Sequence, residues 1–224
     1  MNYEEARVYL EQLSKYGSVL GLENMKALLD RLDNPQDELK FIHISGTNGK
    51  GSVLAYLSSI LQEAGYKTGR YSSPALFSYR ERIQINGEMI DKDSLARYVT
   101  VIADIVEDMR RSHQAAPTVF EIETAMAMMY FKEKKCDIVV LETGLGGALD
   151  ATNVIRTTLL EVIAPIGMDH MDVLGSTLGE IALQKAGIIK EHTRAVTAAQ
   201  KAEAQSVLEA VSYTHLTLPT NSRV

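Results

Sequence analysis

A glycine-rich loop between a short apolar run and an amphipathic stretch constrains the fold of this chain more than any other feature. Residues 41–44 form an apolar run of strand length, and residues 46–52 read GTNGKGS. Apolar residues then recur at helical spacing over residues 52–64, until Gly65 ends the pattern. A strand, a glycine loop and a helix in this order predict a phosphate-binding site, because backbone N–H groups at a helix start attract anions.

The loop residues predicted to bind Mg-ATP are Gly46, Thr47, Asn48, Gly49, Lys50, Gly51 and Ser52. Glycines let the backbone approach the phosphates, a lysine meets their oxygens, and a serine hydroxyl reaches a phosphate or its Mg²⁺. The loop departs from the general GxxxxGK[ST] pattern, because Ile44 stands where that pattern has its first glycine. The alternative is a glycine-rich turn with an exposed lysine, and the flanking strand and helix disfavour it.

The rest of the chain alternates between the two periodicities. Helical spacing covers residues 3–13, 23–32, 91–111, 118–134, 177–185 and a stretch ending at Val211. Strand-like runs cover residues 68–72, 137–142, 159–166 and 195–198, whereas residues 73–90 look irregular. The run 137–142 is apolar without alternation, as in a central strand covered on both faces. We therefore expect an α/β fold with a mostly parallel sheet flanked by helices.

The end of the chain breaks this pattern. Residues 212–224 continue neither the helical spacing before them nor any strand-helix unit. We expect one ATP-binding domain over residues 1–211, incomplete at its C-terminal end. The tail 212–224 is interpreted either as foreign sequence after a truncation or frame error, or as an ordinary frayed terminus.

Composition limits the classes of function. The 224 residues are 46% hydrophobic, which is enough for a sizeable core, and the net charge of −6 comes without a long basic run. We therefore expect neither nucleic acid nor a membrane as partner. A single cysteine, Cys136, and an N-terminus without signal character indicate a cytoplasmic protein. Oligomeric state stays open, with a monomer as the expectation.

Further motifs follow the loop in a fixed order. They are YSSP at 71–74, ERI at 81–83, FExxT at 120–124, LETGLGG at 141–147, LDATN at 149–153, GMDH at 167–170, LG at 174–175 and KAG at 185–187. Together with GTNGKGS, this series resembles the folylpolyglutamate synthase/dihydrofolate synthase branch of the Mur ligases. The resemblance implies a Mur ligase central domain whose C-terminal partner domain is missing. Three departures affect affinity or substrate choice: Ala75 replaces a usual histidine, and Ala148 and Asn24 replace usual arginines.

The resemblance also implies site residues. The metal ligands are Ser73, Glu142, His170 and, if carbamylated by CO₂, Lys185; Lys50, His170 and Lys185 are the catalytic residues. The folate-binding residues are Leu20, Gly21, Thr118, Phe120, Glu121, Leu149, Asp150 and Ala151. From the residues alone, a histidine such as His170 is more often structural, and the 118–121 segment reads equally well as a helix cap. One or two Mg²⁺ ions and ATP are the implied cofactor and co-substrate.

The implied reaction is ATP-dependent ligation of L-glutamate to a folate or dihydropteroate carboxylate through an acyl phosphate. One alternative is a UDP-muramoyl amino-acid ligase, which shares the acyl-phosphate chemistry. The other is a nucleotide-binding module without ligase activity, because family members carry a second domain that this chain lacks. We therefore expect the 224-residue chain to be inactive alone.

Overall fold

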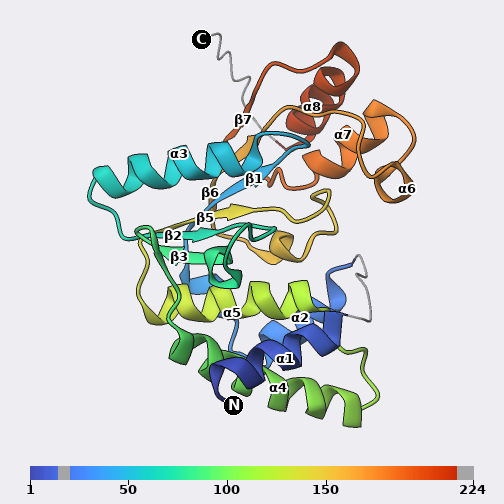
Figure 1. Cartoon of the computed structure of the whole chain (residues 1–224). Helices are drawn as coiled ribbons and strands as arrows, with labels where there is room; N and C mark the ends of the chain where they lie inside the picture. The colour runs from blue at the N-terminus through green and yellow to red at the C-terminus, as the bar shows by residue number, and fades with distance from the viewer. Residues whose placement is uncertain (15–20, 216–224) are drawn as a thin grey trace.

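The computed structural model describes residues 1–14 and 21–215 as one sheet with helices on both faces (Figure 1). The strands are β1 (Phe41–Ser45), β2 (Thr68–Tyr71), β3 (Ile83–Ile85), β4 (Glu88–Met89), β5 (Ile138–Glu142), β6 (Thr158–Ile163) and β7 (Ala195–Thr197). Their order is β4-β3-β2-β5-β1-β6-β7, and the pairs from β2 to β7 are all parallel. The expected fold class is confirmed.

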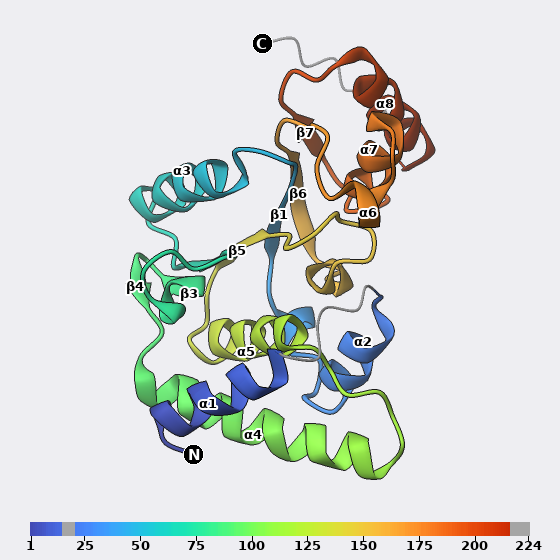
Figure 2. The same cartoon turned by 45° about the vertical axis from the view of Figure 1, so that its right-hand side comes forward.

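The helices form layers outside the sheet. They are α1 (Tyr3–Ser14), α2 (Glu23–Asp30), α3 (Lys50–Glu63), α4 (Lys92–Arg111), α5 (Val119–Glu133), α6 (Met171–Leu174), α7 (Leu178–Ala186) and α8 (Ala202–His215), with 3-10 turns η1 (Pro35–Glu38), η2 (Tyr79–Arg82) and η3 (Ala151–Val154). Helix α3 covers one face and α5 the other, and α1, α2 and α4 pack outside α5 (Figure 2). Enclosed in this way, α5 is apolar around most of its circumference, whereas α4 keeps a polar outer face.

Three apolar cores hold these layers together. The largest joins α1, α2, α4 and α5 to one face of the sheet, a second joins α3 to the other face, and a third joins α7 and α8 to the end of β6. No helix in the described part of the chain is both long and apolar enough to cross a membrane.

Predicted helix starts are confirmed wherever a local side chain supplies the cap. Thr118 accepts from the Glu121 N–H while the Glu121 carboxylate accepts from the Thr118 N–H, and residues 177 and 180 repeat this arrangement at α7. Asp91 caps α4 by accepting from Ser94 N. Helix α3 begins at Lys50, two residues before its apolar spacing shows it, so residues 50–52 of the glycine-rich loop form its first turn.

Three expectations need correction. The stretch 73–90 is not irregular throughout: it contains η2 and the antiparallel hairpin β3–β4, which turns at Asn86-Gly87 with φ of 49° and 81°. Strand β6 ends at Ile163, short of the predicted 166, and Pro165 follows without an N–H to donate. Helix α8 continues to His215, so helical structure does not stop at 211. Residues 216–224 of the predicted tail lie outside the described residues.

Candidate active site

The glycine-rich loop is fixed against the segment that follows β6. A Cβ on Gly46, which has φ of 148°, would lie 2.7 Å from the Ala164 Cβ, so only glycine fits there. Thr47 N donates to Pro165 O at 2.9 Å. The Thr47 hydroxyl accepts from Gly167 N at 3.0 Å and donates to Gly167 O at 3.1 Å. These contacts hold the loop beyond the carboxyl end of β1, where parallel sheets bind ligands.

Two lysines from distant parts of the chain meet at one loop carbonyl. Lys50 Nζ donates to Gly46 O at 3.1 Å, and Lys185 Nζ donates to the same oxygen at 3.0 Å. Lys185 is only 4% exposed, and burial, followed by the Lys50 charge, lowers its pKa to about 8. Within the described residues neither ammonium forms an ion pair with a carboxylate. The pair therefore makes an electropositive point at the start of α3.

Glu142 ends β5 beside this point. Its side chain is buried, which raises the pKa of the carboxyl, and the Lys50 charge, the Ser73 N–H and the Arg70 charge oppose that rise. Tyr71 of β2 is level with Leu141 of β5, so the residues that follow both strands reach the same edge of the sheet. The structure thus brings the predicted ligands Ser73 and Glu142 together. Arg70 was not anticipated, because nothing local in the sequence marks a strand arginine as the neighbour of a distant carboxylate.

Among the described residues, no hydrogen bond or ion pair joins His170 to Ser73 or Glu142. His170 is exposed, precedes α6 with φ of 48°, and its Nε2 lies 3.7 Å from Asp169 Oδ2. No group of three His, Cys, Asp or Glu side chains among the described residues is placed to hold a metal ion. His170 as a metal ligand stays a prediction.

The loop after β5 positions Lys185. A Cβ on Gly147 would lie 2.7 Å from Gln184 O and 2.8 Å from Lys185 O, so glycine allows the loop to touch the backbone of α7. Ala148 N donates to Gln184 O at 2.7 Å, and a Cβ on Gly187 would lie 2.4 Å from the Ala148 Cβ. The departure at position 148 therefore sits in a close contact between two backbone segments.

A buried polar chain fixes the start of the LDATN segment. Asp150 accepts from Leu145 N at 2.8 Å, from Thr152 N at 3.0 Å and from the Thr152 hydroxyl at 2.5 Å. Because that hydroxyl gives its proton to Asp150, it accepts from His43 Nε2, which lies 2.8 Å away. Burial, followed by the Lys190 charge, lowers the pKa of His43 to about 3, so this histidine is neutral. The sequence analysis did not identify His43 as part of a site. The feature that could have indicated it is a single polar side chain within the otherwise apolar run 41–44.

Three of the predicted folate-binding residues, Gly21, Phe120 and Leu149, lie at the loop that follows β5. Gly21 N donates to Leu149 O at 3.3 Å, and Leu149 is 45% exposed. Phe120 packs so closely that a Cβ on Gly144 would lie 2.6 Å from its Cζ. Together these residues make a half-open surface beside the loop.

The remaining folate candidates are mostly engaged internally. Thr118 and Glu121 satisfy each other as a helix cap, and Glu121 is buried. Asp150 and Ala151 are buried as well, the former in the polar chain described above. Leu20 lies outside the described residues.

Comparison with known proteins shows which protein family this chain is similar to. The family model of the Mur ligase middle domain matches residues 44–223. The chain is 45% identical over 207 residues to a dihydrofolate synthase/folylpolyglutamate synthase of Bacillus subtilis, covering 92% of this chain and 48% of that protein. It is 35% identical over 211 residues to a folylpolyglutamate synthase of Lacticaseibacillus casei, covering 94% of this chain and 49% of that protein.

Solved structures agree with the sequence relatives. A folylpolyglutamate synthase complex with AMPPCP superposes with a TM-score of 0.90 at 35% identity, covering 96% of this chain and 52% of that one. The Thermotoga maritima folylpolyglutamate synthase gives 0.86 at 41% identity, covering 95% and 48%. The chain therefore spans about half the length of these relatives.

Proposed function

Since the chain belongs to the Mur ligase family, we propose that it takes part in ATP-dependent ligation of L-glutamate to the carboxylate of a folate or of dihydropteroate. The relatives in Bacillus subtilis and Lacticaseibacillus casei carry the names of such synthases, in agreement with the resemblance drawn from the motifs. The observation that carries the proposal is the meeting of two ammonium groups at Gly46 O, beside the carboxylate of Glu142.

The chemistry needs positioning and charge rather than a protein nucleophile. A carboxylate oxygen of the pterin substrate attacks the γ-phosphorus of ATP, the bond to the β-phosphate oxygen breaks, and ADP leaves. Lys50 and the N–H groups at the start of α3 stabilise the negative charge that spreads over the phosphoryl oxygens. The glutamate amine then attacks the acyl phosphate, an amide bond forms, and phosphate and a proton are released.

Two of the predicted ligands are of the chemical kind that magnesium accepts. The Glu142 carboxylate and the Ser73 hydroxyl are hard oxygen donors at one edge of the sheet, and Mg²⁺ commonly takes its other ligands from phosphates and water. We propose Ser73, Glu142 and His170 as the residues that hold it. When bound, the ion supplies positive charge to the ATP phosphates.

Lys185 is suited to carbamylation. Its pKa of about 8 leaves roughly a tenth of the amine neutral at pH 7, and a neutral amine is the form that attacks CO₂. The ammonium loses one proton to become the neutral amine, and formation of the N–C bond with CO₂ releases a second, so carbamylation converts a buried cation into a carboxylate. That carboxylate would lie near the Lys50 ammonium, since both lysines contact Gly46 O, and is proposed to help hold a second Mg²⁺.

The test uses a fusion, because the chain matches only 48% of its Bacillus subtilis relative. The chain is joined to the unmatched part of that protein, and phosphate release from ATP is measured with dihydropteroate, tetrahydrofolate or a UDP-muramoyl substrate, each with and without glutamate. We expect glutamate-dependent release with a pterin substrate only. A folded fusion that binds AMPPCP but releases phosphate only with the UDP-muramoyl substrate, or with none, contradicts the proposal.

A further inference from the structure

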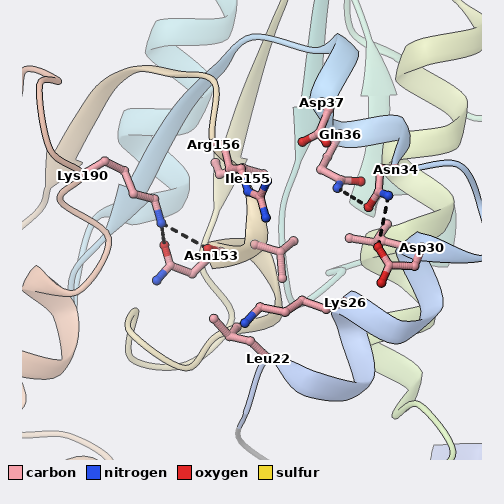
Figure 3. A pocket seen from close by; sticks show the side chains of 12 residues that line it. Leu22, Lys26, Asp30, Asn34, Gln36, Asp37, Asn153, Ile155, Arg156 and Lys190 are labelled. Atoms are coloured by element: carbon pink, nitrogen blue, oxygen red, sulfur yellow. Dashed lines mark hydrogen bonds between the residues drawn. The ribbon is translucent and has the colours of Figure 1, made fainter.

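A cavity of about 560 Å³ lies away from the phosphate loop (Figure 3). Its walls come from α2, η1, η3 and the residues just before β6, together with Lys190. Residues 36–37 precede β1 and residues 155–156 precede β6, so the cavity lies at the amino ends of these parallel strands. The loop 46–52 follows the carboxyl end of β1. The cavity and the proposed ATP site are therefore at opposite edges of the sheet.

Two positively charged side chains line this cavity, and neither forms a direct ion pair in the described part of the chain, although the Glu161 carboxylate lies close enough to Lys190 to interact with its charge. The Arg156 side chain points into the hollow in Figure 3, and in the described part of the chain it makes neither a hydrogen bond nor an ion pair. Lys190 Nζ donates to Asn153 O at 3.1 Å and Asn153 Oδ1 at 2.5 Å, both uncharged oxygens. A third lining cation, Lys26, already pairs with Glu23 at 3.4 Å.

The lining carboxylates lie across the cavity from Arg156 and Lys190. Figure 3 shows Asp30 and Asp37 on the side of α2 and η1, and Asp30 Oδ1 accepts from Asn34 Nδ2 at 3.1 Å. Positive charge is thus concentrated on the wall formed by η3 and its neighbours.

Apolar residues also line the cavity, namely Leu22 and Leu29 of the α2 region and Val154 and Ile155. Leu22 and Val154 are partly exposed, whereas Leu29 and Ile155 are buried. Small-molecule sites typically have volumes of about 300–1,000 Å³, apolar walls and a few convergent polar groups. An arginine fork recognises a carboxylate or phosphate through two parallel hydrogen bonds.

We propose that this cavity is a second small-molecule site, which binds an organic anion. The carboxylate or phosphate of the ligand lies against Arg156 and Lys190, and its apolar body packs on Leu22 and Val154, the two apolar lining residues that are partly exposed.

Binding to the 224-residue chain is measured by isothermal titration calorimetry with benzoate and phenyl phosphate, and with benzyl alcohol as the neutral probe. We expect saturable binding of at least one anion and none of the alcohol. Arg156→Gln should weaken binding about tenfold, the value of one charged hydrogen bond, and Arg156→Lys should give an intermediate affinity.

Two variants locate the binding. Arg194→Gln removes the same charge from an exposed position outside the cavity lining, and Lys50→Ala disables the phosphate loop. Both should keep the dissociation constant within about twofold of the parent chain. The proposal is overturned if neither anion saturates, if the alcohol binds equally well, or if Arg156→Gln binds as the parent does. It is also overturned if Lys50→Ala, rather than Arg156→Gln, abolishes binding, because the anion would then occupy the phosphate loop.

Discussion

Replacing Thr152 by valine removes one hydroxyl from the buried chain that joins His43 to Asp150. That hydroxyl donates to the Asp150 carboxylate at 2.5 Å and accepts from His43 Nε2 at 2.8 Å. Losing a hydrogen bond to a charged group costs about 1.5–3 kcal/mol, and an unpaired buried N–H adds about 1–3 kcal/mol. Because valine nearly preserves the shape, we expect the free energy of unfolding to fall by about 3–5 kcal/mol.

Urea-induced unfolding, followed by circular dichroism near neutral pH, measures this loss directly. Thr197→Val is the matched control, since its hydroxyl also donates one hydrogen bond, to Ala198 O, and accepts one, from Gln200 Nε2, both at 3.0 Å, but lies exposed on strand β7 where water can replace them; we expect a change within about 0.5 kcal/mol. A loss below about 1 kcal/mol for Thr152→Val would refute the reasoning, because the polar chain would then contribute little to stability.

Three further substitutions test the pH dependence and the site. The pKa of His43 is about 3 in the folded chain and 6.5 in the unfolded chain, so between these pH values only the unfolded state binds the extra proton. As the pH drops below about 6, the free energy of unfolding of the parent, relative to that of His43→Gln, should therefore fall by up to about 1.4 kcal/mol per pH unit. A difference between the two proteins that does not change with pH contradicts this prediction. Lys50→Ala should weaken AMPPCP binding by at least about tenfold in calorimetry, whereas exposed Lys40→Ala should not; equal affinities would remove Lys50 from the phosphate site. With ¹³C-bicarbonate, the parent should show a carbamate NMR signal that Lys185→Ala lacks. Short carboxylates should restore ligase activity to the fusion that carries Lys185→Ala. If Lys185→Ala shows the same carbamate signal as the parent, Lys185 is not the carbamylated residue.

Local signals made much of the fold predictable. The capping boxes at Thr118 and Thr177 lie within four residues each, and they fixed two helix starts correctly. The same kind of signal was overlooked at Asn86-Gly87, a favourable hairpin turn, because its strands have only three and two residues. The end of α8 was predicted too early, at residue 211. The residues that follow have no apolar pattern to indicate a helix, yet the helix continues through them to His215.

Long-range contacts could not be derived from the residues themselves. His43 bonds to a threonine 109 positions away, and Lys185 reaches Gly46 across 139 positions. The family motifs named Lys185 and Glu142 as site residues, but nothing in them indicated that two lysines share one carbonyl. The cavity at Arg156 and Lys190 joins segments far apart in the chain, and no motif covers it.

The carbonyl of Gly46 can be understood as a resting position for both lysines. A carbonyl oxygen has two lone pairs, and Lys50 and Lys185 engage this one at 3.1 and 3.0 Å. A phosphate that enters the loop offers Lys50 an acceptor to exchange for this one, so its ammonium is already partly desolvated and aimed before the ligand arrives. The rearrangement on loading is then a short swing of a side chain rather than the recruitment of a mobile surface lysine, which lowers the entropy cost of binding.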